Sequence, residues 1–118
     1  MLGSLKEERI LHLIDEAILQ VSTLRESNAA EIISILEKTR RVLEGRVNAA
    51  RDVPLILSAA RWRVAHVEKY TVRRIVHDEV DGRAMSILVR VRLICAEAIR
   101  ILDLALNDLR LSRARFKS

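Results

Sequence analysis

The sequence is poor in aromatic residues, glycine, proline and cysteine. Only three of its 118 residues are aromatic, so a buried core must be almost entirely aliphatic. The sequence has only three glycines and one proline, the residues typical of turns and loops. This composition favours a nearly all-helical chain with short connections. The single cysteine, Cys95, excludes an intramolecular disulfide, and nothing implies an oxidising compartment.

Long hydrophobic runs are also missing. Lys6, Glu7 and Glu8 stand where the apolar part of a secretory signal would begin. Charged residues interrupt the most apolar region, 86–106, which argues against a membrane span. We therefore expect a cytoplasmic protein without a membrane anchor. The net charge of +5 is modest and rests mainly on arginine.

The stretch 83–111 carries the strongest pattern in the sequence. Apolar residues recur there at the i, i+3, i+4, i+7 spacing of a helix with one buried side. Because such a face is not stable in water alone, other helices must cover it. The residues of this face are Ile87, Leu88, Val91, Ile94, Cys95, Ala98, Ile101, Leu102, Ala105, Leu106 and Leu109.

Three short breaks divide the rest of the chain, at 26–28, 52–54 and 81–82. Gly82 in the last break is expected to end a helix in the left-handed conformation. Connections this short place consecutive helices antiparallel. The sequence thus predicts an all-α fold, a single-domain, antiparallel up-down-up-down four-helix bundle over 1–118, with helices at about 4–25, 29–51, 54–80 and 83–113.

Two helices carry more apolar residues than one buried face needs. The third has a core stripe and a second stripe around to one side, and the fourth has Val89, Leu93, Leu104 and Leu111 away from its main face. Either these side chains are singly exposed, or they form a patch that self-associates. We favour a homodimer, and the residues expected to form it are Trp62, Val72, Val76, Leu93 and Leu104.

No group of residues has the spacing of a metal or catalytic site. His66 and His77 are eleven residues apart on one helix, about 16 Å, which is too far for one metal ion. Cys95 on an aliphatic stripe is expected to be a core residue rather than a nucleophile. We expect no catalytic, cofactor-binding or metal site, no small-molecule ligand and no enzyme activity.

Three charged residues lie along the line between the two stripes of the third helix. They are Arg61, Glu68 and Glu79. Glu68 and Glu79 are the carboxylates most able to be buried, and pairing with Arg61 or an arginine of the fourth helix would explain them. The sequence leaves open whether these three side chains are buried.

Residues 61–66 read R-W-R-V-A-H. An arginine followed after four residues by a histidine resembles the active-site motif of the HEPN family, helical-bundle ribonucleases. The resemblance implies RNA cleavage by Arg61 and His66 at a dimer interface. The family usually has a polar residue after the arginine, where this chain has Trp62.

Basic residues suggest nucleic-acid binding without cleavage as a further alternative. The third helix contains Arg63, Arg73 and Arg74. The C-terminus is also basic, with Arg110, Arg113, Arg115 and Lys117. Acidic residues interleave elsewhere, and no aromatic stacking platform is expected. We therefore do not expect a nucleic-acid partner.

Short connections, capped helices and an aliphatic core without a converging polar cluster resemble a computationally designed, de novo four-helix bundle. The resemblance implies a structural scaffold that has no intrinsic biochemical activity and is able to self-associate. A natural helical oligomerisation or protein-interaction module fits the same features, because Gly45 and the bias to arginine are not idealised choices.

Overall fold

Helix α4, Gly82–Lys117, is the longest element of the protein and lies along its full length. In the computed structural model the backbone is described for residues 4–45 and 53–117, and side chains for 8–45 and 53–110. The 36 residues of α4 span roughly 54 Å at 1.5 Å per residue. This matches the long axis of the molecule, 55 Å.

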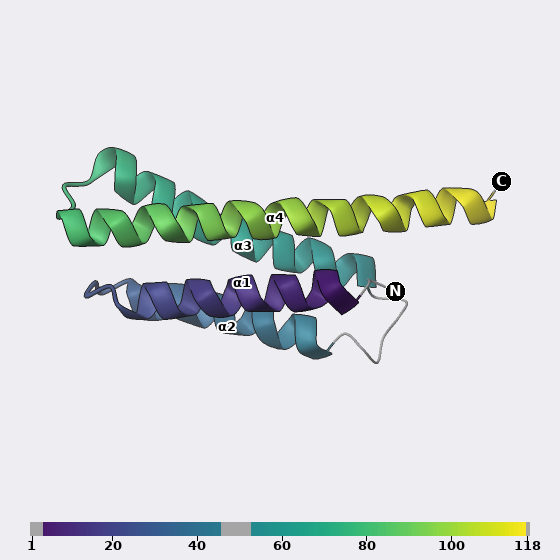
Figure 1. Cartoon of the computed structure of the whole chain (residues 1–118), viewed down its shortest axis with the longest axis horizontal. Coiled ribbons are helices and arrows are strands. Elements are labelled where there is room, and N and C mark those ends of the chain that lie inside the picture. The colour runs from purple at the N-terminus through teal and green to yellow at the C-terminus, as the bar shows by residue number, and fades with distance from the viewer. Residues whose placement is uncertain (1–3, 46–52, 118) are drawn as a thin grey trace.

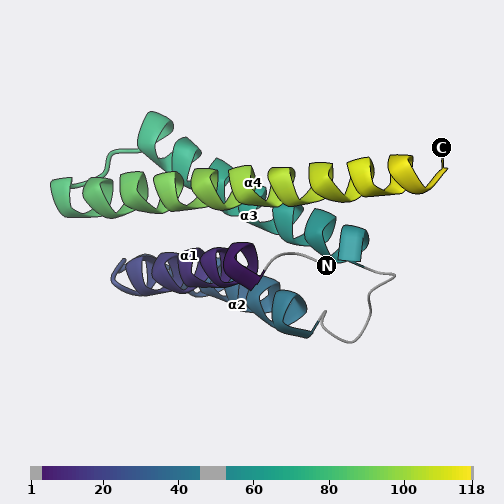
Figure 2. The ribbon, with the colours of Figure 1, turned by 45° about the vertical axis from the view of Figure 1, so that its right-hand side comes forward.

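The described residues contain four helices and no strand, so the fold is all-α. The other three helices are α1 (Ser4–Ser22), α2 (Ala29–Gly45) and α3 (Val53–His77). Each helix packs against two others: α1 against α2 and α4, and α3 against α2 and α4. Figures 1 and 2 show this arrangement, with the colours running in opposite directions along consecutive helices. The packing is compatible with the predicted up-down order.

The predicted aliphatic face of α4 forms the centre of the core. Its eight buried members are Leu88, Val91, Ile94, Cys95, Ala98, Ile101, Leu102 and Ala105, and Ile87, Leu106 and Leu109 are partly buried. Thr39 and Thr71 are the buried polar side chains among the described residues. Each donates its hydroxyl to a backbone carbonyl of the preceding turn, at 2.8 and 2.7 Å. The core is therefore apolar, with its hydroxyl groups satisfied.

Helix α1 ends three residues before its predicted end, because two hydroxyls compete for its last carbonyls. Ser22 donates to the Leu19 carbonyl at 2.6 Å, and Thr23 donates to that of Gln20 at 2.7 Å. The amides of Thr23 and Leu24 bond three residues back, which tightens the last turn. Helix α3 ends at His77, short of position 80, and α4 continues past 113 to Lys117. The predicted end of the second helix, at 51, lies outside the described residues.

The prediction for Gly82 was wrong. No described glycine has a positive φ, and Gly82 is the first residue of α4 rather than the end of α3. Asp81 makes this boundary instead, since its Oδ1 accepts a hydrogen bond from the Ala84 amide at 2.8 Å. Its carbonyl accepts from Met85, also at 2.8 Å. Asp81 is thus the N-cap of α4, and its side chain satisfies an amide that has no partner within the helix.

Among the described residues, no helix is both long enough and apolar enough to cross a membrane.

Candidate functional site

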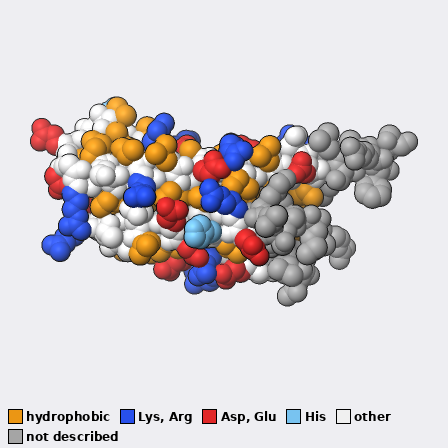
Figure 3. Space-filling view, in the orientation of Figure 1, with side chains coloured by type: hydrophobic (Ala, Val, Ile, Leu, Met, Phe, Trp, Pro, Cys, Tyr) orange, Lys and Arg blue, Asp and Glu red, His pale blue; other side chains and the backbone are white. Residues whose placement is uncertain are grey.

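Five aliphatic side chains of α3 and α4 remain exposed outside the core. They are Val72 and Val76 of α3 and Val89, Leu93 and Leu104 of α4, and we call them the α3–α4 face. Val76 is 65% exposed and Leu93 is 57% exposed. Figure 3 shows hydrophobic side chains gathered over the end of the molecule where α3 and α4 are joined. Side chains of this kind in a cluster are typical of an interaction surface.

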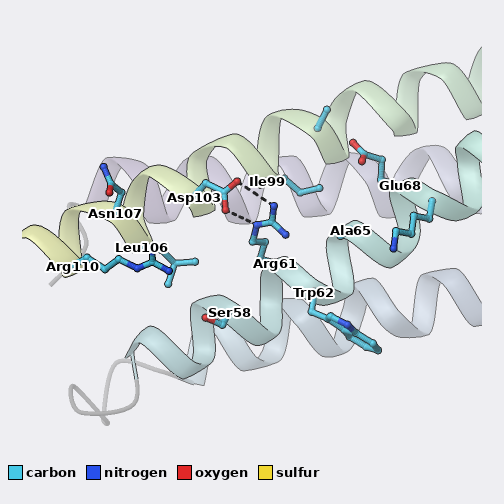
Figure 4. Close-up of a pocket in the computed structure, with 12 residues that line it drawn as sticks. Ser58, Arg61, Trp62, Ala65, Glu68, Ile99, Asp103, Leu106, Asn107 and Arg110 are labelled. Atoms are coloured by element: carbon cyan, nitrogen blue, oxygen red, sulfur yellow. Dashed lines mark hydrogen bonds and ion pairs between the residues drawn. The ribbon is translucent and has the colours of Figure 1, made fainter.

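A groove between α3 and α4 continues this face toward the other end of the bundle. It has a volume of about 850 Å³ and is lined by both helices, including Ala65, Ile99 and Leu106 (Figure 4). Glu68 and Lys69 line it too, and the same two residues line a smaller hollow of about 360 Å³ with Val72 and Val76. The groove and the apolar part of the face are therefore continuous.

An ion pair crosses the groove between the two helices. Arg61 of α3 donates hydrogen bonds from Nε and Nη2 to the two carboxylate oxygens of Asp103 on α4 (Figure 4). This bidentate contact raises the pKa of Arg61 above its usual value, against a smaller opposing effect of burial. Both side chains are nearly half exposed, so the pair orients the helices more than it stabilises them.

The structure corrects the expected partner of Arg61. The sequence placed Glu68 and Glu79 as candidates for that pairing, but Arg61 bonds Asp103, with Glu68 acting only through a weaker charge interaction. Glu68 is partly buried beside the groove, and Glu79 is exposed. Asp103 was not singled out from the sequence because it lies on the exposed side of α4, where charged residues need no special explanation.

Arg61 and His66 do not converge within one chain. Five residues separate them, which turns the helix by about 140°, and Arg61 is directed to Asp103. His66 stacks instead on Trp62, with ring centroids 6.0 Å apart and planes at 22°. The HEPN resemblance implies a pair at a dimer interface, which stays a prediction.

Trp62 lies on the outer side of α3, where its side chain is 70% exposed. It was predicted to share a surface with Val72. Ten residues separate the two, a turn of about 80° around the helix, and Trp62 also lines the groove between α3 and α4. Figure 4 shows the indole directed away from Asp103. Trp62 and His66 form an exposed ring pair that the sequence analysis did not anticipate.

A polar cluster that the sequence analysis missed joins the α1–α2 connection to α3. Glu26 accepts hydrogen bonds from Tyr70 Oη, at 2.9 Å, and from Arg74, which also bonds Asp78 at 2.7 Å. The side chains of Glu26 and Arg74 are only 18% and 23% exposed. The available signal was the i, i+4 spacing of Tyr70 and Arg74 outside both apolar stripes.

The hydrogen bonds of this cluster shift the pKa values of its members. Arg74 lowers the pKa of Glu26 below its usual 4.5, against a smaller opposing effect of burial. Burial, and then the hydrogen bond to Glu26, raise the pKa of Tyr70 above 10.0. The cluster is thus an ion pair whose groups bond one another, and Glu26, Arg74 and Asp78 also line a surface hollow of about 350 Å³.

Cys95 is buried in the core and has no chemical partner for activation. Burial, with a smaller contribution from the charge of Glu68, raises the pKa of its thiol to about 12. A nucleophilic cysteine requires a lowered pKa, so Cys95 behaves as a small apolar residue. Among the side chains described, at 8–45 and 53–110, no three His, Cys, Asp or Glu residues are grouped to hold a metal ion.

Comparison with known proteins adds no family to this description. No family model matches the chain, and no match is found among curated proteins or among solved structures.

Proposed function

We propose that this protein is a structural, non-enzymatic helical module, an antiparallel up-down-up-down bundle of the cytoplasm whose α3–α4 face binds a second copy of the chain. The observation that carries the proposal is the exposure of five aliphatic side chains on that face. The core beneath is already complete, so these side chains have no role inside one chain. Water-exposed aliphatic groups favour association because their burial is worth about 25 cal/mol per Å².

A twofold interface suits this face because the same patch is used by both copies in an isologous pair. The interface would then bury five aliphatic side chains from each copy, ten in all. The charged groups near the face, Lys69 and Arg73 on α3, lie toward its edge, where a polar rim remains hydrated. Arg61 is already neutralised by Asp103, so its charge does not oppose burial of the groove.

The proposal applies to a designed scaffold and to a natural oligomerisation module alike. The two differ in stability, since idealised designs unfold above about 90 °C and ordinary mesophilic domains at about 45–65 °C. They also differ in partners, because a natural module has a biological one. A thermal unfolding midpoint measured by circular dichroism separates them.

Aspartate substitutions on and off the face test the proposed association. Val76→Asp and Leu93→Asp should each reduce the mass measured by light scattering after size exclusion to that of one chain. The matched control is Leu19→Asp on α1, which introduces the same charge at a leucine that is 64% exposed. The control should keep the mass of two chains. Equal behaviour of all three variants would contradict the assignment of the interface to the α3–α4 face.

A further inference from the structure

The outer side of α3 presents a row of aromatic and basic side chains. Trp62, His66, Lys69, Arg73 and His77 recur every three or four residues and are all exposed. We call this row the α3 ridge. It extends over roughly 22 Å, from the 15 residues between positions 62 and 77 at 1.5 Å per residue.

The ridge contains no carboxylate. Glu68 is the single acidic residue between positions 62 and 77, and it lines the groove on the side of α4. Two acidic residues near the ends of the ridge are already bonded, Asp103 to Arg61 and Asp78 to Arg74. No ion pair involving Lys69 or Arg73 is present among the described residues. The ridge thus carries two cations, Lys69 and Arg73, on a chain of net charge +5, and Glu68 lines the hollow beside them.

One end of the ridge carries a flat stacking surface. The Trp62 and His66 rings lie 22° from parallel, and the indole is 70% exposed. An exposed indole offers a partner ring an offset-stacked or edge-to-face contact. Aromatic plates beside cations are the combination that binds unpaired nucleobases together with their phosphates.

We propose that the α3 ridge binds single-stranded nucleic acid, with a base stacked on Trp62 and His66 and phosphates contacted by Lys69 and Arg73. This goes beyond the proposed self-association, although the ridge borders the α3–α4 face. Lys69, Arg73 and His77 line one hollow with Val72 and Val76, and Trp62 lies about 80° around the helix from Val72. The polyanion is favoured over an acidic peptide because a peptide carboxylate matches the cations but supplies no ring for the stack.

The test uses the fluorescence of Trp62, the single tryptophan of the chain. Full-length protein is titrated with a twelve-nucleotide oligouridylate, and in parallel with inorganic polyphosphate and with polyglutamate. Oligouridylate should quench the emission, since its bases stack on the indole, and the two polyanions without bases should leave it nearly unchanged. Equal quenching by all three polyanions, or no quenching by oligouridylate at low salt, overturns the proposal.

Charge reversal locates the phosphate contacts. Lys69→Glu/Arg73→Glu should weaken oligouridylate binding about tenfold or more, and should reduce the slope of log affinity against log salt by about 1.4, for two lost contacts. The matched control is Lys38→Glu/Arg41→Glu on α2, where both side chains are exposed. Each pair of substitutions changes the net charge by −4, from +5 to +1.

The control variant should bind nearly as the unmodified protein does, and circular dichroism should show both variants folded. Equal weakening in the two variants would mean that net charge alone holds the oligonucleotide, which overturns the ridge as a site. Trp62→Ala, followed by anisotropy of a labelled oligouridylate, should also lose roughly tenfold in affinity. Unchanged affinity of that variant would contradict the stacked base.

Discussion

Arg74 of α3 donates two hydrogen bonds to the carboxylate of Glu26, a residue 48 positions earlier in the connection between α1 and α2. The same carboxylate accepts a bond from Tyr70, one turn before Arg74. Both charged side chains are largely shielded from water. The cluster therefore ties the first helical connection to the C-terminal half of α3, where α3 carries few other polar contacts to the rest of the chain.

Replacing Glu26 with Gln should lower the free energy of unfolding by about 1–2 kcal/mol, because a partly buried charge-assisted pair is lost. Urea unfolding followed by circular dichroism measures the change. The control is Glu44→Gln, which removes an ion pair with Arg40 whose side chains are nearly half exposed. That variant should lose no more than about 0.5 kcal/mol. Equal losses in both variants would show that the Glu26 pair contributes no more to the free energy of unfolding than an exposed ion pair does.

The contribution of Glu26 should disappear in acid. Its pKa in the folded chain is lowered by Arg74, so unfolding takes up a proton when the pH is near or below the usual value of 4.5. The stabilisation is complete above that value and is lost as the pH falls through the lowered pKa. The difference in unfolding free energy between the unmodified protein and Glu26→Gln should be constant above about pH 6 and shrink toward pH 3. A difference that grows in acid would contradict the ion pair.

Tyr70 should ionise only at strongly alkaline pH. Burial, followed by the hydrogen bond to Glu26, raises its pKa above 10.0, so stability is lost as the pH rises beyond that value. Tyr70 is the single tyrosine, and its absorbance near 295 nm reports the titration directly. The midpoint should fall toward 10.0 in Glu26→Gln, and it should reach that value in urea. A native midpoint at or below 10.0 would be inconsistent with the buried hydroxyl.

Cys95 should resist alkylation in the folded protein. Its thiol is buried, with its pKa raised to about 12, and the reactive species is the thiolate. Iodoacetamide at pH 8 should leave native protein nearly unmodified and should label it fully in denaturant, as followed by mass spectrometry. Rapid labelling of the native protein would place Cys95 at an accessible surface and contradict the packing of α4.

The sequence was sufficient to predict the helices and the core, because both follow from apolar periodicity along the chain. The buried face of α4 is the clearest case. Helix ends were less predictable: Ser22 and Thr23 end α1 by bonding backbone carbonyls, and Asp81 rather than Gly82 sets the start of α4. These effects depend on side-chain rotamers that periodicity does not contain.

The charged contacts between helices were the least predictable feature. Arg61 or an arginine of the fourth helix was expected to pair with Glu68 and Glu79, yet Arg61 bonds Asp103 once α3 and α4 pack. Glu26 was assigned to a loop and contacts Tyr70 and Arg74 only because the bundle brings that connection against α3. Trp62 was grouped with aliphatic residues by its hydrophobicity, and its 70% exposed side chain lines the groove between α3 and α4.

Sedimentation equilibrium of the unmodified chain at low to high micromolar concentration tests the central claim most directly. The chain has a mass of 13.5 kDa, and association through the α3–α4 face predicts a fitted mass that rises to twice this value with concentration. A mass that stays at 13.5 kDa over the whole range would show that the exposed valines and leucines of α3 and α4 do not join two copies.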